Sequence, residues 1–122
     1  MAVPRISKED LKQRLEAGAA PVIVDVRLKY PYEHSTVMLP GAIRLHPKSF
    51  DPASLPRDRE IVLYDSDPDE LVSAPLVAEL LRRGYRASAL KGGINDWITA
   101  KLPTDTKEAP QAAPPAPGSL KG

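Results

Sequence analysis

Residues 61–83 read IVLYDSDPDELVSAPLVAELLRR, and this stretch decides the fold class. Its first four residues form an apolar run, which is typical of a strand buried on both faces of a sheet. Over residues 72–83 the apolar residues recur at helical spacing, with Val77, Leu80 and Leu81 on one face. A buried strand that passes through a polar loop into an amphipathic helix predicts an α/β fold with a mainly parallel sheet.

The chain before this stretch shows the same alternation of helices and strands. Ser7 and the acidic residues after it form a helix start signal, and Leu11 and Leu15 then supply one apolar face. Gly18 is expected to end that helix. Outside residues 61–64, three further strands are expected, at residues 21–26, 42–45 and 86–90.

The last predicted helix follows a Gly92-Gly93 turn, and Ile94 and Trp97 are expected to anchor it on the sheet. In α/β proteins with helices on both faces of a parallel sheet, ligands bind beyond the carboxyl ends of the strands. The loop that follows Tyr64 lies at such an end, so we expect the functional residues there.

The composition describes one small domain without an excess of charge. The 122 residues carry 17 basic and 16 acidic side chains, so a net charge of +1 provides no general attraction for nucleic acid or anionic membranes. No apolar run approaches the roughly 20 residues of a membrane-spanning helix. We therefore expect a cytoplasmic monomer with neither nucleic-acid nor membrane partners.

A change in composition near Pro103 marks the expected end of the domain. Residues 104–122 contain almost no large apolar residue but include four prolines, Pro110, Pro114, Pro115 and Pro117. Such a composition is typical of a disordered or polyproline-like tail. The sequence therefore predicts a domain at residues 1–103 and a Pro/Ala-rich tail at residues 104–122.

The chain contains no cysteine, which excludes disulfides, thiolate metal sites and cysteine nucleophiles. The two histidines, His34 and His46, are too few for a zinc site without carboxylate ligands. We expect neither a metal nor a cofactor.

Four separated motifs carry a resemblance to a known family: DVR at residues 25–27, LPGAI at 39–43, IVLY at 61–64, and GGI at 92–94 followed by Trp97. In this order and at these spacings, the chain resembles a rhodanese domain over about residues 6–102. The resemblance implies a five-stranded, mainly parallel sheet with helices on both faces. It also implies sulfurtransferase chemistry, in which a cysteine directly after the central strand carries a persulfide.

The resemblance places Asp65 at the position of that cysteine. An ionised carboxylate only accepts hydrogen bonds and cannot hold a transferable sulfur atom, so no residue is predicted to be catalytic. The resemblance also implies that Asp25 and Arg27 support the loop from below. We expect a structural role for them, as an ion pair or through a set of hydrogen bonds to backbone carbonyls. The positions equivalent to the family's active loop are Asp65, Ser66, Asp67, Pro68, Asp69, Glu70, Leu71, Val72 and Ser73.

This loop places four negative charges, on Asp65, Asp67, Asp69 and Glu70, within six residues. At a separation of ~7 Å and an effective dielectric near ~40, each additional pair costs about 1 kcal/mol. Free amides at the start of the following helix can offset this cost. We hypothesise that one carboxylate fills the position where a rhodanese holds its anionic substrate. The plainer interpretation is an ordinary loop that enters a helix with acids in its first turn.

Two other interpretations of the same residues are weaker. The spacing of Asp65, Asp67 and Asp69 matches the first three ligands of a calcium loop, but Glu70 stands where glycine is needed and Leu76 where a bidentate Glu is needed. Asp65 and Asp67 after an apolar strand also resemble the acid pair of haloacid-dehalogenase-type phosphatases.

The favoured interpretation is that the chain is a rhodanese-like module that does not transfer sulfur. It is expected to serve in binding or regulation, with an unknown protein as its partner. One alternative is residual sulfur transfer, or transfer that depends on a partner. The other is a phosphate or divalent-metal site formed by aspartates of residues 65–70.

Overall fold

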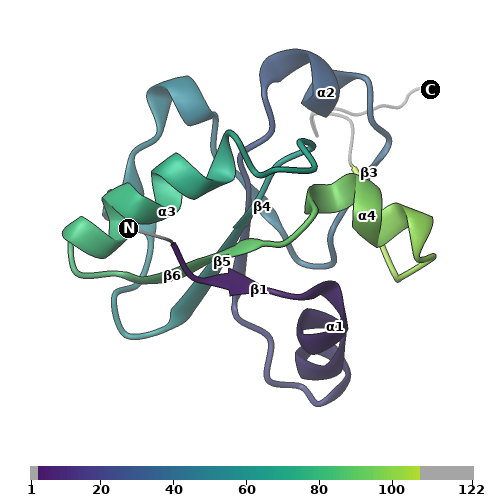
Figure 1. The fold of residues 1–122 in the computed structure, drawn as a ribbon, viewed down its shortest axis with the longest axis horizontal. Coiled ribbons are helices and arrows are strands. Elements are labelled where there is room, and N and C mark those ends of the chain that lie inside the picture. Colours follow the sequence, from purple (N-terminus) through teal and green to yellow (C-terminus); the bar gives the residue numbers. More distant parts are fainter. Residues whose placement is uncertain (1–2, 108–122) are drawn as a thin grey trace, which may run out of the picture.

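The computed structural model describes residues 3–107 and contains a five-stranded sheet at its centre (Figure 1). All neighbouring strands in this sheet are parallel. In spatial order the strands are β1 (Arg5–Ile6), β6 (Arg86–Leu90), β5 (Glu60–Tyr64), β2 (Val22–Asp25) and β4 (Ile43–Arg44). The prediction of a five-stranded, mainly parallel α/β sheet with β5 at its centre is confirmed.

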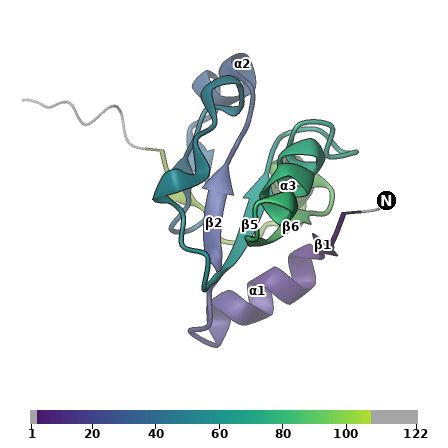
Figure 2. The same cartoon turned by 90° about the vertical axis from the view of Figure 1, so that its left-hand side faces the viewer.

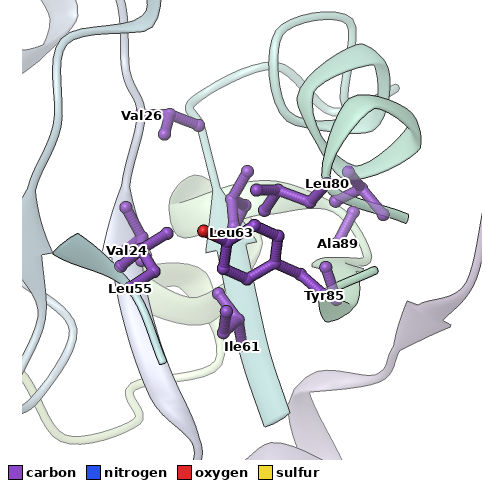
Figure 3. Packing of buried hydrophobic residues seen from close by; sticks show 10 residues of the cluster. Val24, Val26, Leu55, Ile61, Leu63, Leu80, Tyr85 and Ala89 are labelled. Atoms are coloured by element: carbon purple, nitrogen blue, oxygen red, sulfur yellow. The ribbon is translucent and has the colours of Figure 1, made fainter. Parts of the chain in front are cut away.

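The alternation of side chains along β5 explains why its apolar run is continuous. Ile61 and Leu63 belong to one buried cluster, which also contains Val77 and Leu80 of α3 (Ser73–Arg82) and is drawn in Figure 3. The residues between them point to the opposite face of the sheet, because successive side chains of a strand alternate.

The second cluster lies on that opposite face. It joins Val62 and Tyr64 of β5 to Leu11 of α1 (Lys8–Glu16) and to Trp97 of α4 (Gly93–Thr99). Trp97 is fully buried, so its predicted role as the anchor of the last helix is confirmed. Figures 1 and 2 show α3 on the other side of the sheet from α1.

Short elements connect these layers. The helix α2 (Lys29–Glu33) follows β2, and two 3-10 helices, η1 (Pro47–Ser49) and η2 (Pro52–Ser54), lie between β4 and β5. No helix within the described residues is long and apolar enough to cross a membrane.

A short strand lies beyond residue 103, where the sequence predicted the end of the domain. Residues Asp105–Thr106 form β7, which pairs in antiparallel fashion with β3 (Val37–Met38). The Lys107 amide then donates to the carbonyl of Thr36 at 2.8 Å. This ladder lies within the residues predicted as a tail, because composition does not reveal a two-residue ladder. The rest of the predicted tail, residues 108–122, lies outside the described residues.

Candidate functional site

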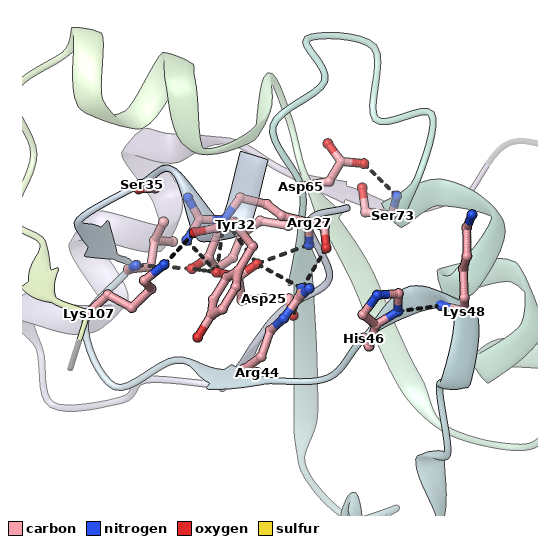
Figure 4. A network of polar contacts seen from close by, with 12 residues as sticks. Asp25, Arg27, Tyr32, Ser35, Arg44, His46, Lys48, Asp65, Ser73 and Lys107 are labelled. Carbon is pink, nitrogen blue, oxygen red and sulfur yellow. Dashed lines mark hydrogen bonds and ion pairs between the residues drawn. The ribbon is translucent and has the colours of Figure 1, made fainter. Parts of the chain in front are cut away.

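The side chain of Asp65 is enclosed by backbone amides at the carboxyl end of β5. It is only 1% exposed. Its Oδ2 accepts hydrogen bonds from the amides of Val72 and Ser73, at 2.9 and 2.6 Å, and its Oδ1 accepts one from the amide of Asp67, at 2.8 Å. Figure 4 shows the carboxylate directed at the backbone of Ser73. Both oxygens of Asp65 are therefore engaged by the chain's own amides.

These contacts make Asp65 the cap of α3. The residue before the helix, Val72, has no side-chain acceptor, although the first amides of any helix need one. Asp65 supplies it from the end of the preceding strand. Its negative charge also interacts favourably with the positive end of the helix dipole.

The next acid, Asp67, folds the loop back on itself. Its Oδ1 accepts the amide of Asp69 at 2.7 Å, which repeats the contact between Asp65 and Asp67 two residues further on. The side chain of Asp69 itself is exposed. The repulsion expected between the carboxylates of this loop is thus offset mainly by hydrogen bonds from backbone amides of the loop and the start of α3.

The fourth acid, Glu70, connects the loop to two distant segments. It is 4% exposed and has a left-handed φ of 54°. Its Oε1 accepts from Nε of Arg5 on β1, and its Oε2 accepts from the amide of Gly92 at 2.9 Å. Sequence reasoning missed Arg5, because no local pattern links it to a residue so far along the chain.

The turn before α4 packs closely against the same loop. The amide of Ile94 donates to the carbonyl of Asp65 at 2.9 Å. A Cβ added to Gly93, which has a φ of +69°, would lie only 2.6 Å from that carbonyl oxygen. Glycine is therefore required at this position by both sterics and backbone conformation.

A buried ionic network lies next to the end of β5. Nη2 of Arg27 donates to Oδ2 of Asp25 at 2.6 Å, and these side chains are 2% and 0% exposed. The hydroxyl of Tyr64 donates to the same carboxylate at 2.8 Å and accepts the amide of Leu39 at 3.2 Å. Because Tyr64 directly precedes Asp65, this network fixes the strand end from which the loop starts.

A second guanidinium completes the network. Nη1 of Arg44 donates to the carbonyl of Arg27 at 2.6 Å and lies 3.7 Å from Oδ1 of Asp25. Its guanidinium also stacks 4.1 Å from the centre of the Tyr32 ring. Burial lowers the pKa of Arg44 from its ordinary value.

The hydroxyl of Tyr64 predicts a loss of stability at alkaline pH. Burial, together with the Asp25 carboxylate, raises the pKa of this hydroxyl above its usual value. Above about pH 10 the unfolded chain releases the proton while the folded chain retains it, so stability falls by up to about 1.4 kcal/mol per pH unit. Below that pH the contribution is fully present. Urea unfolding between about pH 9 and about pH 11 measures this slope.

Two phenylalanine variants assign that slope to one residue. Tyr64→Phe should flatten it, whereas Tyr30→Phe should leave it unchanged because Tyr30 is 70% exposed. Equal slopes for the two variants would contradict the assignment.

The remaining residues of the predicted loop occupy varied positions. The carbonyl of Ser66 accepts Nδ2 of Asn95 at 3.0 Å, and Leu71 is 68% exposed. The Oγ of Ser73 is buried and has no hydrogen-bond partner. Pro68, Asp69 and Glu70 line a cavity of about 480 Å³ beside the start of α1. The structure thus brings Asp65, Val72 and Ser73 together and leaves Leu71 at the surface.

The loop acids do not converge as metal ligands would. Within residues 3–107 no three His, Cys, Asp or Glu side chains are grouped so that they could hold a metal ion. Asp65, the first residue of the calcium-like spacing, directs both of its oxygens at amides.

Comparisons with known proteins identify the family of the chain. A family model described as Rhodanese-like domain matches residues 7–100. No curated protein matches the sequence.

Three similar solved structures illustrate the likeness of the fold. A protein from Lactobacillus plantarum is 24% identical, with a TM-score of 0.74 and coverage of 84% of this chain and 88% of that one. A rhodanese-like domain from Anabaena is 25% identical, with a TM-score of 0.69 and coverage of 92% and 88%. A rhodanese-like domain protein from Staphylococcus aureus is 22% identical, with a TM-score of 0.69 and coverage of 86% and 99%.

Proposed function

Because this chain belongs to the rhodanese-like domain family, yet contains no cysteine, we propose that it does not transfer sulfur and serves as a binding or regulatory module. One observation carries the proposal. The Asp65 carboxylate lies in the amide cradle at the start of α3, with both oxygens engaged and 1% exposure. A carboxylate in this position neither carries sulfur nor leaves the amides free for an anionic donor.

The charge of the loop supports the same function. Asp67 and Asp69 add negative charge beside the cradle, and Glu70 is held close to it by Arg5. An anionic sulfur donor such as thiosulfate would be repelled at this position. The fold of the family is retained, and in this proposal its surface serves to recognise a protein partner.

The geometry weighs against the phosphatase-like alternative. A carboxylate nucleophile must reach its phosphate ester, but Asp65 is enclosed and its oxygens accept three amide hydrogen bonds. The same engagement removes Asp65 as a ligand for a divalent cation.

A cyanide-dependent thiocyanate assay tests the loss of sulfur transfer. The wild-type chain is expected to form no thiocyanate from thiosulfate and cyanide above the blank without protein. Asp65→Cys should instead attack the outer sulfur of thiosulfate and form a persulfide while sulfite leaves, because a thiolate at this position is stabilised by the amides of Val72 and Ser73. Mass spectrometry would detect the added sulfur.

Asp67→Cys is the matched control. It places a thiol in the same loop but outside the cradle, so sulfur uptake should be clearly lower than with Asp65→Cys. Circular dichroism would check that both variants fold. Thiocyanate turnover by the wild-type chain would contradict the proposal. The binding role further requires that affinity capture from source-cell extract retains a protein partner.

A further inference from the structure

The outward side of α3 carries apolar side chains that face solvent. Leu71 precedes the helix and is 68% exposed. Ala74, Pro75 and Ala78 follow it at helical spacing. We call Leu71, Ala74, Pro75 and Ala78 the α3 strip. The strip lines a cavity of about 390 Å³ together with Val3 and the charged residues Arg5, Asp69 and Glu70.

A second cavity continues this groove toward the other end of α3. It has a volume of about 220 Å³ and is lined by Pro4, Glu60, Leu81, Arg86, Ala87 and Ser88. Val3 and Pro4 are neighbours in the chain and each contributes to one cavity. Both cavities therefore lie beside the N-terminal segment, one near the start of α3 and one near its end.

The two ends of this groove carry opposite charge. Asp67 and Asp69 lie in the loop before α3, and Asp69 is exposed. At the other end Arg82, Arg83 and Arg86 are all exposed.

The acids at the basic end are already paired. Glu79 accepts from Arg82 and Arg83, at 2.5 and 2.7 Å, and Glu60 is paired with Arg14. The basic end therefore keeps an excess of positive charge, while the acidic end keeps a negative one.

We propose that the α3 strip pairs with the same surface of a second copy of this chain, with the two α3 helices antiparallel about a twofold axis. Such a contact is isologous, so each acidic end meets the basic end of the partner copy. The ten residues of α3 span about 15 Å, and their centre lies between Val77 and Ala78. Leu71 of one copy then faces the groove beside Leu81 of the other.

The same geometry sets Asp69 of one copy opposite Arg86 of the other. The small side chains of Ala74 and Ala78 lie near the axis, where they let the two helices approach closely. A second copy is the occupant that matches the apolar centre and both charged ends at once. The proposal replaces the sequence-based expectation of a monomer, since the groove exists only in the folded chain, and it does not depend on the proposed function.

Sedimentation equilibrium of the full chain tests this contact. In low salt, between about 10 μM and about 1 mM protein, the weight-average mass should rise from 13.3 kDa toward twice that value. Leu71→Glu should weaken association about tenfold or more, because it places a charge where an apolar side chain is expected to pack in the groove of the partner copy. Asp69→Lys and Arg86→Glu should each weaken it as well. Combined in one chain, these two changes should restore association, since each opposed pair is then rebuilt with its charges exchanged.

Ile98→Glu is the matched control, because Ile98 is 42% exposed on α4 and lies outside the proposed interface. It should leave association unchanged, and unfolding curves would check that every variant is folded. A mass that stays at 13.3 kDa over the whole range overturns the proposal. So does an Ile98→Glu effect equal to that of Leu71→Glu, or a failure of the double exchange to restore association. Either an equal effect of Ile98→Glu or a failure of the double exchange would show that the copies associate through a different surface.

Discussion

Replacing Arg27 with methionine is expected to lower the free energy of unfolding by about 3–5 kcal/mol. The reason is the buried carboxylate of Asp25, which is 0% exposed and receives three hydrogen bonds from the Arg27 side chain. Without this guanidinium, the nearest remaining cation is Arg44, at 3.7 Å from Oδ1 of Asp25. Urea unfolding monitored by circular dichroism measures the loss.

A double-mutant cycle separates the ion pair from the packing of the arginine stem. Asp25→Asn combined with Arg27→Met should cost less than the sum of the two single changes, because the uncompensated charge is gone. Arg82→Met is the control for an exposed pair and should leave stability nearly unchanged. If Arg27→Met lowered the free energy of unfolding no more than Arg82→Met does, the buried network would not make the stabilising contribution expected here.

Replacing Asp65 with alanine is expected to lower the free energy of unfolding by about 2–4 kcal/mol. The carboxylate is the acceptor for the amides of Asp67, Val72 and Ser73, and the contact to Ser73 is buried. Alanine would leave these donors unpaired at the start of α3 and would remove the charge that complements the helix dipole. Chemical denaturation measures the loss, and hydrogen exchange should show it concentrated at the first turn of α3.

Two further variants test the origin of that loss. Asp67→Ala removes an acceptor for a single amide of the exposed Asp69, and should cost much less. Asp65→Asn keeps the shape but directs an NH₂ group at amide donors, so it should fall between the wild type and Asp65→Ala. Equal losses for Asp65→Ala and Asp67→Ala would show that the cradle does not stabilise α3.

These two sites explain how a rhodanese-like fold is stable without a cysteine at the end of β5. The buried pair of Asp25 and Arg27, with Tyr64, holds the end of β5, and Asp65 then caps the helix that follows. The helix start thus obtains an internal acceptor. In the proposed function this acceptor stabilises the fold and takes the position of the nucleophile.

The main elements of the fold were predictable because the spacing of apolar residues along the chain indicates which side chains are buried. Residues 61–64 are apolar on both faces of the sheet, and the structure places them in β5. The strand predicted at residues 86–90 is β6, and the helix predicted over 72–83 is α3 at Ser73–Arg82. The motifs that resemble a rhodanese also identified the family.

The short elements were not predictable, since distant partners define them. Arg5 and Ile6 form β1 only because they pair with Ala89 and Leu90 of β6. The ladder of β3 and β7 is likewise only two residues long, so neither side shows a periodic pattern. This is why the domain end predicted at residue 103 came before β7.

The sequence by itself determined the α/β class, the order of the main strands and helices, the absence of a cysteine, and the concentration of acids after Tyr64. These features depend on composition and on the spacing of neighbouring residues. Only the tertiary structure decided which acid caps α3 and which one binds Arg5. Asp65 and Glu70 carry the same charge in the same loop, and their roles differ because folding brings Ser73 to one and Arg5 to the other.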